Sequence, residues 1–369
     1  MRTPTPRSPR PAGARLAALA ALLLAAAPLA AADFLLTTTK PNQLHLVDAK
    51  ARATVRSITI PGPGSPVSVA ASPDGRIAYV LTNRLGSISG IDLDSGAEVF
   101  RADFDEPGKR IKGMFGMDLS PDGRELVIMQ AVTRLEQVEM VVEAPRIAVY
   151  RTDAGLQAQP DRLLPAPRRT VLLLYNDAGD RLYAVSWDIE VLDPRDGRRI
   201  ETLKAMNWER PNYAPPDIFG VWGQYEQARV FVNPYFALRT DKSPDDPAAW
   251  KTGMLTLDLN SGEYRMDDFE ETAAIMFSSV VNPVKRDEAF SVYTQLTKTD
   301  LANDRLVKRV DLDHTYYTIN IAADGSEVYL GGTMNDIAIY ATDTLEKIGT
   351  IDLPGDADMG TTWVRVIQR

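Results

Sequence analysis

Apolar and polar residues alternate along much of the chain, and residues 67–104 carry this pattern in its clearest form. Short alternating runs at 67–71, 76–81, 87–92 and 97–102 are separated by segments rich in Pro, Asp, Ser and Gly. Period-two alternation bounded by such turns predicts antiparallel strands joined by hairpins. Four short strands in about 40 residues match one blade of a β-propeller.

The turn expected between the third and fourth strands of this unit recurs seven times. Its second residue falls at positions 48, 92, 151, 193, 258, 300 and 341. Successive copies are 41 to 44 residues apart, except for two wider intervals of 59 and 65 residues. A repeat of about 42 residues with two enlarged units predicts seven blades.

The turn expected between the first and second strands occurs only six times. It is strong at 72–75, 120–123, 176–179 and 323–325, and weaker at 224–227 and 282–286. The first predicted strand, 34–38, has the pattern of the second strand of a blade, so the N-terminal blade lacks its first strand. The last predicted strand, 362–368, has no partner in its own repeat. We therefore predict an all-β, seven-bladed β-propeller whose ring is closed when the C-terminal strand joins the N-terminal blade.

Residues 1–32 differ from the rest of the chain. Four arginines precede a short Ala/Leu run at 16–27, and Ala30, Ala31 and Ala32 supply the small residues of a cleavage site. This arrangement predicts a cleaved secretory signal peptide over 1–32, followed by a single propeller domain over 33–369. The alternative, an N-terminal membrane anchor, would need a longer apolar run. A leader rich in Arg and Ala is typical of bacteria, so we expect the protein in the periplasm.

The acidic balance of the chain bears on its partners. The formal net charge is −9, and removal of a leader that holds four Arg and no acidic residue would make it −13. Such a surface repels phosphate backbones, which argues against nucleic acid as a partner. It suits a basic protein partner, although solvation alone also accounts for an acidic surface.

The chain has no cysteine and only two histidines. Without cysteine, it cannot attach haem covalently, build a thiolate metal site, use a thiol nucleophile or form a cofactor with a Cys thioether. Two histidines also exclude a copper or zinc centre made of several imidazoles. Stability must come from packing and ring closure, since no disulfide can form.

The two enlarged units carry insertions at 131–145 and 233–253, and insertions in a propeller project from one face, where binding usually occurs. Four of the five tryptophans fall in or near the fifth unit. We interpret this aromatic group as a candidate binding surface, with blade core as the alternative. Its members are Trp187, Trp208, Trp222, Trp250, Tyr213, Phe219, Tyr225, Tyr235 and Phe236.

Few residues of this chain are candidates for a catalytic or metal-binding role. His45 alternates with two leucines on a predicted strand, which favours a structural role, and His314 lies at the start of an inner strand, where residues can approach the central channel. The run from Asp92 to Gly96 resembles a calcium loop, but it lacks the later bidentate Glu and recurs as a strand turn. No nucleophile elbow, phosphate-binding loop or pair of catalytic carboxylates stands out.

Several segments resemble the β subunit of bacterial quinohemoprotein amine dehydrogenase. The more specific ones are His314-Thr-Tyr-Tyr-Thr-Ile-Asn-Ile321 and the two insertions, which include Arg134-Leu-Glu136. Pro216-Asp217 leading to Val221-Trp222 is also similar. The remaining similar segments are 120–123, 323–326, 330–332, 344–347 and 351–355.

The resemblance implies a seven-bladed propeller without a cofactor of its own, in a periplasmic heterotrimer that oxidises primary amines to aldehydes and ammonia. It places cysteine tryptophylquinone on a small subunit and haem c on a dihaem cytochrome c subunit. The propeller would hold the small subunit and wall the cavity for the amine at the subunit interface. We expect no catalytic, cofactor-binding or metal-binding residue on this chain. Trp222, Trp250, Tyr316 and Tyr317 are expected at or near the partner or substrate-cavity surface.

Two other interpretations of the function remain open. The chain could be a free-standing periplasmic propeller that acts as a binding or scaffolding module. It could also be the heavy subunit of an enzyme of the methylamine dehydrogenase type, which shares the propeller architecture. That enzyme would carry tryptophan tryptophylquinone on its light subunit and pass electrons to an external copper or haem protein.

Overall fold

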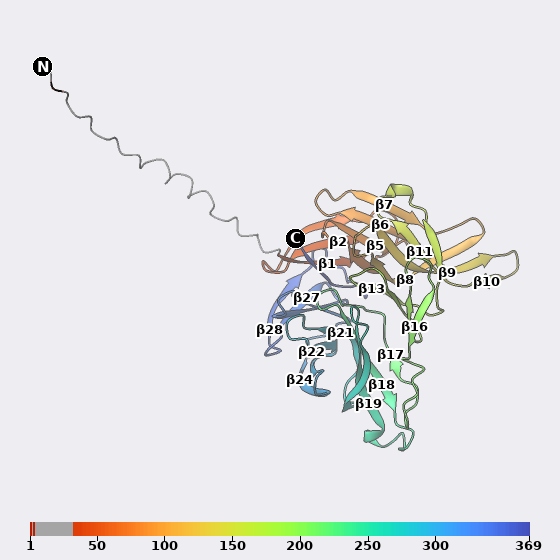
Figure 1. The fold of residues 1–369 in the computed structure, drawn as a ribbon, viewed down its shortest axis with the longest axis vertical. Coiled ribbons are helices and arrows are strands. Elements are labelled where there is room, and N and C mark those ends of the chain that lie inside the picture. Colours follow the sequence, from red (N-terminus) through yellow and green to blue (C-terminus); the bar gives the residue numbers. More distant parts are fainter. Residues whose placement is uncertain (2, 4–31) are drawn as a thin grey trace. The chain divides into compact units, whose positions relative to one another are not determined.

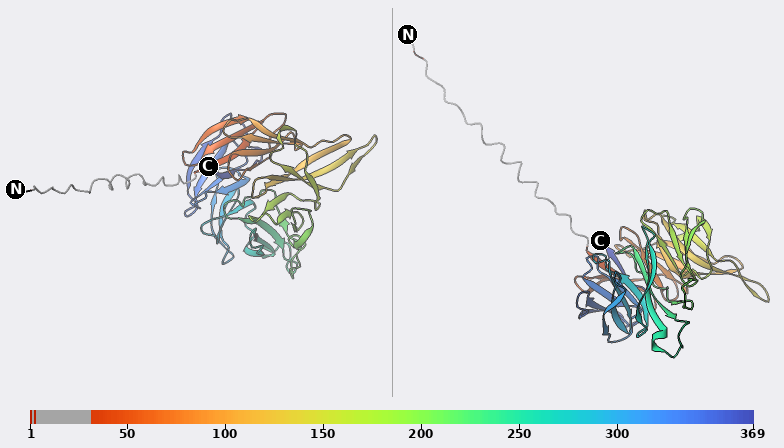
Figure 2. Two further views of the ribbon diagram at one scale, coloured as in Figure 1. Left: turned by 45° about the horizontal axis from the view of Figure 1, so that its top comes forward. Right: turned by 60° about the horizontal axis from the view of Figure 1, so that its bottom comes forward.

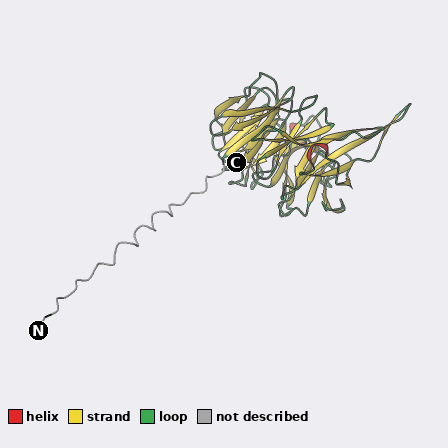
Figure 3. Ribbon diagram, turned by 90° about the horizontal axis from the view of Figure 1, so that it is seen from above, coloured by secondary structure: helices red, strands yellow, loops and turns green. Residues whose placement is uncertain are grey.

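Seven antiparallel sheets follow one another around a ring, as Figures 1 and 2 show. This computed structural model describes residues 1, 3 and 32–369, and residues 32–369 form one compact unit. The all-β, seven-bladed propeller is thereby confirmed. Figure 3 shows that strands dominate the described part, where two short 3-10 helices, η1 (Gly155–Gln157) and η2 (Pro247–Ala249), occur. The predicted signal peptide lies almost entirely outside the described residues.

The blades are numbered I to VII along the chain. Blades I to III contain these strands, from the inner edge outward: in I, β29 (Arg365–Gln368), β1 (Asp33–Thr39), β2 (Gln43–Asp48) and β3 (Ala53–Thr59); in II, β4 (Ser68–Ala71), β5 (Ile77–Thr82), β6 (Ser87–Asp92) and β7 (Glu98–Asp103); in III, β8 (Lys109–Leu119), β9 (Glu125–Leu135), β11 (Arg146–Arg151) and β12 (Arg162–Pro165), with β10 (Met140–Val142) also paired to β9.

Blades IV to VII each contain four strands, again from the inner edge outward: in IV, β13 (Leu172–Tyr175), β14 (Leu182–Val185), β15 (Ile189–Leu192) and β16 (Arg199–Leu203); in V, β17 (Asp217–Ile218), β18 (Val230–Leu238), β19 (Trp250–Asp258) and β20 (Tyr264–Glu271); in VI, β21 (Met276–Val281), β22 (Glu288–Tyr293), β23 (Gln295–Asp300) and β24 (Arg305–Asp311); in VII, β25 (Thr318–Ile321), β26 (Glu327–Gly331), β27 (Asp336–Ala341) and β28 (Lys347–Asp352).

Blade I is assembled from both ends of the described chain. Strand β29 pairs antiparallel with β1, with Phe34 opposite Ile367 and Leu36 opposite Arg365. The predicted closure by the C-terminal strand is confirmed, although regular pairing begins at Arg365 rather than at residue 362. Figure 1 shows the C-terminus beside β1.

In every blade the turn after the third strand contains a residue in a left-handed conformation at the same repeat position, although in blade III the connection then continues through η1 to residue 161. Glycine occupies this position in blades II to V, with φ of +78° at Gly96 and +72° at Gly197. In blades I, VI and VII the position is filled by Arg52, Asp304 and Leu345, with φ between +47° and +55°. Glycine adopts these angles without steric cost, so the sequence signal is strongest where glycine is present.

The carboxylate of Asp92 stabilises its turn directly. Its Oδ1 accepts hydrogen bonds from the backbone N–H groups of Asp94 and Ser95, at 3.1 and 2.7 Å, and from the Ser95 hydroxyl at 2.8 Å. This run is therefore an Asx-type turn, in which the side chain bonds its own backbone. The segment that superficially matches a calcium loop has this structural function in blade II.

Burial decreases from the inner strands to the outer ones. All four residues of β13 and of β25 are buried, whereas β3 alternates exposed positions with half-buried ones and with one buried residue, Ile58. The alternation follows from the pleat, because successive side chains of a strand point to opposite faces. In the outer strands one face packs on the neighbouring blade and the other meets solvent. No helix in the described part is long and apolar enough to cross a membrane.

Blades III and V are the enlarged ones, as the repeat spacing predicts. In blade III the insertion lengthens β8 and β9 to 11 residues each and adds β10, which makes a five-stranded sheet in place of the expected four. In blade V it lengthens β18 and β19 to nine residues each. Figure 2 shows the β9–β10 hairpin as a long projection.

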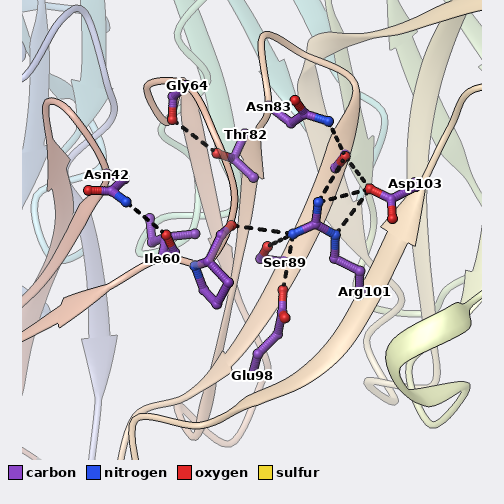
Figure 4. A network of polar contacts seen from close by, with 11 residues as sticks. Asn42, Ile60, Gly64, Thr82, Asn83, Ser89, Glu98, Arg101 and Asp103 are labelled. Carbon is purple, nitrogen blue, oxygen red and sulfur yellow. Dashed lines mark hydrogen bonds and ion pairs between the residues drawn. The ribbon is translucent and has the colours of Figure 1, made fainter.

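Polar side chains join the first two blades at their edge, as Figure 4 shows. The Arg101 guanidinium donates to the Asp103 carboxylate at 2.9 and 3.1 Å and to the Pro61 carbonyl, in the link between the blades, at 3.3 Å. Asn42 donates to the Ile60 carbonyl at 3.0 Å. These bonds satisfy backbone groups where the chain passes from one sheet to the next.

Arg365, on the closing strand, crosslinks three parts of the ring. Its side chain is 6% exposed. It donates to the carbonyls of Val69 in blade II, at 3.0 Å, and Gly223 in blade V, at 2.7 Å, and it pairs with Glu226. Its guanidinium also lies 4.0 Å from the centre of the Trp363 ring. Burial lowers the pKa of Arg365 to about 10, which leaves it charged at neutral pH.

We predict that Arg365→Ala will destabilise the propeller by about 3–5 kcal/mol, because it leaves Glu226 and two buried carbonyls without their partner. Urea denaturation followed by tryptophan fluorescence measures this loss. Arg124→Ala is the matched control, since the Arg124 side chain is 77% exposed and its removal should change stability by less than about 0.5 kcal/mol. An Arg365→Ala variant as stable as this control would contradict the crosslinking role.

His45 generates a pH-dependent stability. The side chain is buried, with the Thr39 and Ser57 hydroxyls each 2.9 Å from a ring nitrogen, and burial lowers its pKa to about 4. The unfolded chain takes up a proton near pH 6.5. Stability contributed by neutral His45 is therefore complete above pH 6.5 and is lost as the pH falls toward 4.

We expect the free energy of unfolding to fall by at most about 3 kcal/mol between pH 7 and pH 4 through His45 alone. The His45→Gln variant removes this titration while its amide can still bond both hydroxyls, so its stability should depend less steeply on pH. Denaturant titrations of both proteins at a series of pH values test this expectation. Parallel pH profiles would refute it.

Candidate docking face

Two kinds of loop open at the same end of every blade: the loop from the second to the third strand, and the loop that leaves the fourth strand. We call this end the aromatic face. It comprises the loops at 166–171, 186–188, 204–216, 239–249, 272–275 and 312–317 and the strand ends next to them, and the inner-edge segment 219–223, which continues from β17 of blade V, lies beneath these loops. The turns between first and second strands, including 72–75 and 120–123, form the opposite face.

Five rings pack together on the aromatic face. Phe277 lies at their centre, with ring centroids 4.1 Å from Tyr293, 5.5 Å from Tyr317 and 5.8 Å from Trp222, at interplanar angles of 25°, 22° and 10°. Phe219 packs on Phe277 at 5.3 Å and 37°. We call these five residues the aromatic stack. Offset stacking of this kind contributes about 0.5–1.5 kcal/mol per pair.

Three neighbouring blades supply the aromatic stack. Phe277 and Tyr293 lie at the start of β21 and the end of β22 in blade VI, Phe219 and Trp222 belong to blade V, and Tyr317 precedes β25 of blade VII. The Trp222 indole donates to the Thr361 carbonyl at 3.1 Å. The Tyr317 N–H donates to the Gly331 carbonyl at 3.0 Å. The first bond orients the Trp222 ring, and the second holds the backbone that carries Tyr317.

The rings of the aromatic stack remain accessible. Phe219 is 41% exposed, and the other four are half-buried. A contiguous group of exposed aromatic side chains is typical of a protein interaction surface, where aromatic residues provide most of the binding energy. Trp222 and Tyr317, two of the residues predicted for the partner surface, are thus brought together here.

Tyr316 lies in the interior, unlike its neighbour Tyr317. It is 1% exposed, and its hydroxyl donates to Asp336 Oδ2 at 2.7 Å. Burial and this bond to a carboxylate raise the pKa of Tyr316 well above its usual value. The side chain is therefore not on the surface of the free chain, because consecutive residues of an extended segment point to opposite sides.

His314 fixes the same loop. Its Nε2 lies 3.0 Å from Asp336 Oδ1, and its Nδ1 lies 3.0 Å from the Thr315 carbonyl oxygen. The His314 and Tyr316 rings pack with centroids 4.1 Å apart. Asp336 thus binds both rings, and this arrangement holds the segment that presents Tyr317.

Trp250 occupies a separate position on the aromatic face. It lies where η2 meets β19, in the enlarged hairpin of blade V, and its indole donates to the Pro244 carbonyl at 3.3 Å. The side chain is 43% exposed. Trp250 is accessible, but it belongs to the projecting hairpin rather than to the aromatic stack, and its predicted place at a partner surface stays a prediction.

Other members of the predicted aromatic group have structural roles. Trp208 packs edge-on against Tyr213 and Tyr235, with centroids 5.5 and 5.3 Å apart. Arg210 pairs with Asp268 at 2.8 Å, and the Tyr235 hydroxyl donates to the same carboxylate at 2.6 Å. This cluster holds the loop at 204–216 against the hairpin of blade V.

Tyr225 belongs to a buried polar cluster toward the opposite face. With Asp118, Arg229 and Arg365 it lines a cavity of about 360 Å³. The Asp118 carboxylate accepts hydrogen bonds from the N–H groups of Tyr175 at 2.7 Å and Leu119 at 2.9 Å. Burial raises the pKa of Asp118 and that of Tyr225. Arg229 donates to the Tyr175 carbonyl at 2.9 Å and lies 5.1 Å from the centre of the Tyr225 ring, and Arg365 bonds to backbone carbonyls, which suits a structural role at the end of the channel.

His, Asp and Glu are the side chains of this chain that could bind a metal ion or haem iron. Among residues 32–369, no three His, Asp or Glu side chains come together in a way that could hold a metal ion. Both histidines already use both ring nitrogens, His45 with two hydroxyls and His314 with a carbonyl and a carboxylate. Neither imidazole is free to act as an axial haem ligand.

We predict that His314→Ala will lower stability by about 1–3 kcal/mol, because it leaves the half-buried Asp336 without one donor and frees the loop at 312–317. Urea denaturation measures the loss, and near-ultraviolet circular dichroism reports whether Tyr317 leaves the stack. His314→Gln, which can still donate to Asp336, should lose less. Equal behaviour of His314→Ala and the unmodified chain would contradict the anchoring role.

Comparison with known proteins supports the fold. No protein-family model matches the sequence, and no curated protein matches it either. A structure of a functionally unknown protein from Desulfotomaculum acetoxidans is similar, with a TM-score of 0.59, 9% identity and 90% and 98% of the two chains covered. Hydrazine synthase of Kuenenia stuttgartiensis is similar, with a TM-score of 0.54, 13% identity and coverage of 89% and 90%.

The β-propeller domain of Cps50 (Swd1) from Myceliophteria thermophila is also similar, with a TM-score of 0.53, 13% identity and coverage of 81% and 88%. At such identities a likeness in structure establishes the architecture and not the activity. The chain is a β-propeller by its own sheet topology and by its similarity to these structures.

Proposed function

We propose that this chain is the propeller subunit of a periplasmic quinohemoprotein amine dehydrogenase, and that its aromatic stack is the surface that holds another subunit. The observation that carries the proposal is the stack itself, five rings from three blades that remain accessible on one face. Such a surface leaves apolar area in contact with water, which is unfavourable unless a partner covers it.

The resemblance in sequence supports the identity of the complex. Trp222 and Tyr317 both fall in segments similar to the β subunit of that enzyme, and their rings are 5.7 Å apart although 95 positions separate them. The segments that carry the resemblance thus supply neighbouring parts of one surface. This agreement favours a docking function over a role for either residue in the blade core.

The chain's own residues would act by position. In the proposed assembly, cysteine tryptophylquinone on the small subunit and haem c on the cytochrome subunit supply the redox chemistry. This chain has no Cys to form a thioether and no free imidazole to bind iron. Its rings would hold the small subunit, exclude water from the joint cavity and orient a primary amine there.

The double variant Trp222→Ala/Tyr317→Ala tests this function when it is coexpressed with the genes next to its own. We expect weaker retention of the partner subunits, by more than about tenfold in dissociation constant, because each ring is the kind of side chain that dominates interfaces. Amine-dependent bleaching of the quinone absorption should fall with the assembly. Leu163→Ala, which removes an exposed apolar side chain from outer strand β12, is the control.

Unchanged assembly and amine turnover in the double variant would refute the aromatic stack as the docking surface. Purification of the native protein as a single colourless chain would refute the amine dehydrogenase. That second outcome would favour the free-standing binding propeller.

A further inference from the structure

An apolar pocket opens on the aromatic face between blades IV and V. Its volume is about 190 Å³. Buried side chains of the two blades, among them Ile189, Phe231 and Leu255, line the pocket, and Trp187, Phe219 and Arg169 also contribute to its lining. Trp187 is 39% exposed and Phe219 is 41% exposed, so both contact solvent as well as the pocket.

The Trp187 side of the pocket is rigid before anything binds. The Trp187 indole donates to Asn207 Oδ1 at 3.2 Å, and the Asn207 amide donates to Asp188 Oδ2 at 2.8 Å. Asp188 Oδ1 in turn accepts from the N–H groups of Ala205 and Asn207, at 2.8 and 3.0 Å. A wall fixed in this way lowers the entropic cost of binding, because no side chain has to be ordered.

Two exposed arginines are adjacent in the chain here, Arg169 at the rim and Arg168 before it. Both form none of the ion pairs found among residues 32–369, whereas Arg162 and Arg195, toward the opposite face, pair with Glu125 and Asp193. The Arg169 guanidinium lies 4.2 Å from the centre of the Trp187 ring. On a chain of net charge −9, this local positive charge at an apolar opening attracts a carboxylate.

The backbone at Arg169 is unusual. Its φ is +66°, in a turn where the Thr170 hydroxyl donates to the Pro167 carbonyl at 2.9 Å. A side chain larger than glycine rarely adopts this conformation, which costs energy. Here the turn places the Arg169 guanidinium against the Trp187 ring at the rim, where it is available to bind a partner.

Phe219 joins this pocket to the aromatic stack. It lines the pocket and packs on Phe277 at 5.3 Å. The apolar surface therefore continues from the stack of blades V to VII into the pocket between blades IV and V. A partner that covers the stack lies within reach of the pocket.

We infer that this pocket receives a bulky apolar side chain of the partner polypeptide, and that a carboxylate next to that side chain pairs with Arg169. The inference rests on the proposed docking function and adds the chemistry of the partner. The volume is below the roughly 300 Å³ of small-molecule sites and suits one anchoring side chain. A cationic amine is disfavoured, because Arg169 at the rim and the adjacent Arg168 would repel it.

The test uses the purified full chain with its tryptophan indoles labelled with nitrogen-15, and three capped dipeptides as probes. Acetyl-Phe-Glu-amide combines the two proposed features, acetyl-Phe-Lys-amide reverses the charge, and acetyl-Ala-Glu-amide removes the apolar anchor. We expect the first to shift the Trp187 indole signal, assigned with Trp187→Phe, and to bind up to about fivefold more tightly than the second. The third should cause no shift.

Arg169→Gln should abolish the difference between the Glu and Lys probes while the Phe-dependent shift remains. Arg124→Gln, an exposed arginine on the opposite face, should preserve the difference. Equal binding of the Glu and Lys probes to the unmodified chain, or no shift at Trp187 up to the solubility limit, would overturn the inference. The chain is tested alone, so this outcome is independent of whether it assembles into an amine dehydrogenase.

Discussion

The pairing of β1 with β29 is the interaction on which the rest of the structure depends. Six blades are made from contiguous segments, whereas blade I needs strands that lie more than 320 residues apart. The same terminal segment also holds the aromatic stack and the end of the channel. Thr361 accepts the bond from Trp222 of the aromatic stack, and Arg365 anchors the channel through Val69 and Gly223. Ring closure and the geometry of the binding face are therefore coupled.

Much of the fold could be predicted from the sequence, because each blade repeats local turn chemistry. The turn at Asp92 is defined by its own side-chain bonds and by a left-handed glycine, and both signals are visible in four consecutive residues. The position of Tyr316 could not be settled in this way. Two adjacent tyrosines in an extended segment must face opposite sides, but only the packed structure determines which one is buried.

The surfaces between blades could not be predicted, since no local pattern describes them. Phe277 and Tyr293 sit in ordinary strand positions, and they become part of a binding surface only where blade VI meets its neighbours. The pocket with Trp187 arises in the same way, from residues of two blades. Trp208 is the opposite case. The sequence made it a candidate for a binding surface, whereas in the structure it fixes a loop.

The seam in blade I also has a consequence for the order of events during folding. Strand β1 comes at the start of the domain and β29 at its end, so the ring cannot close until the whole domain is available to fold. Bringing together such distant segments is entropically costly and slow. During that interval the inner edge of β1 is unpaired and can add foreign strands. Before β29 pairs, blade I therefore presents an open edge that the finished ring covers.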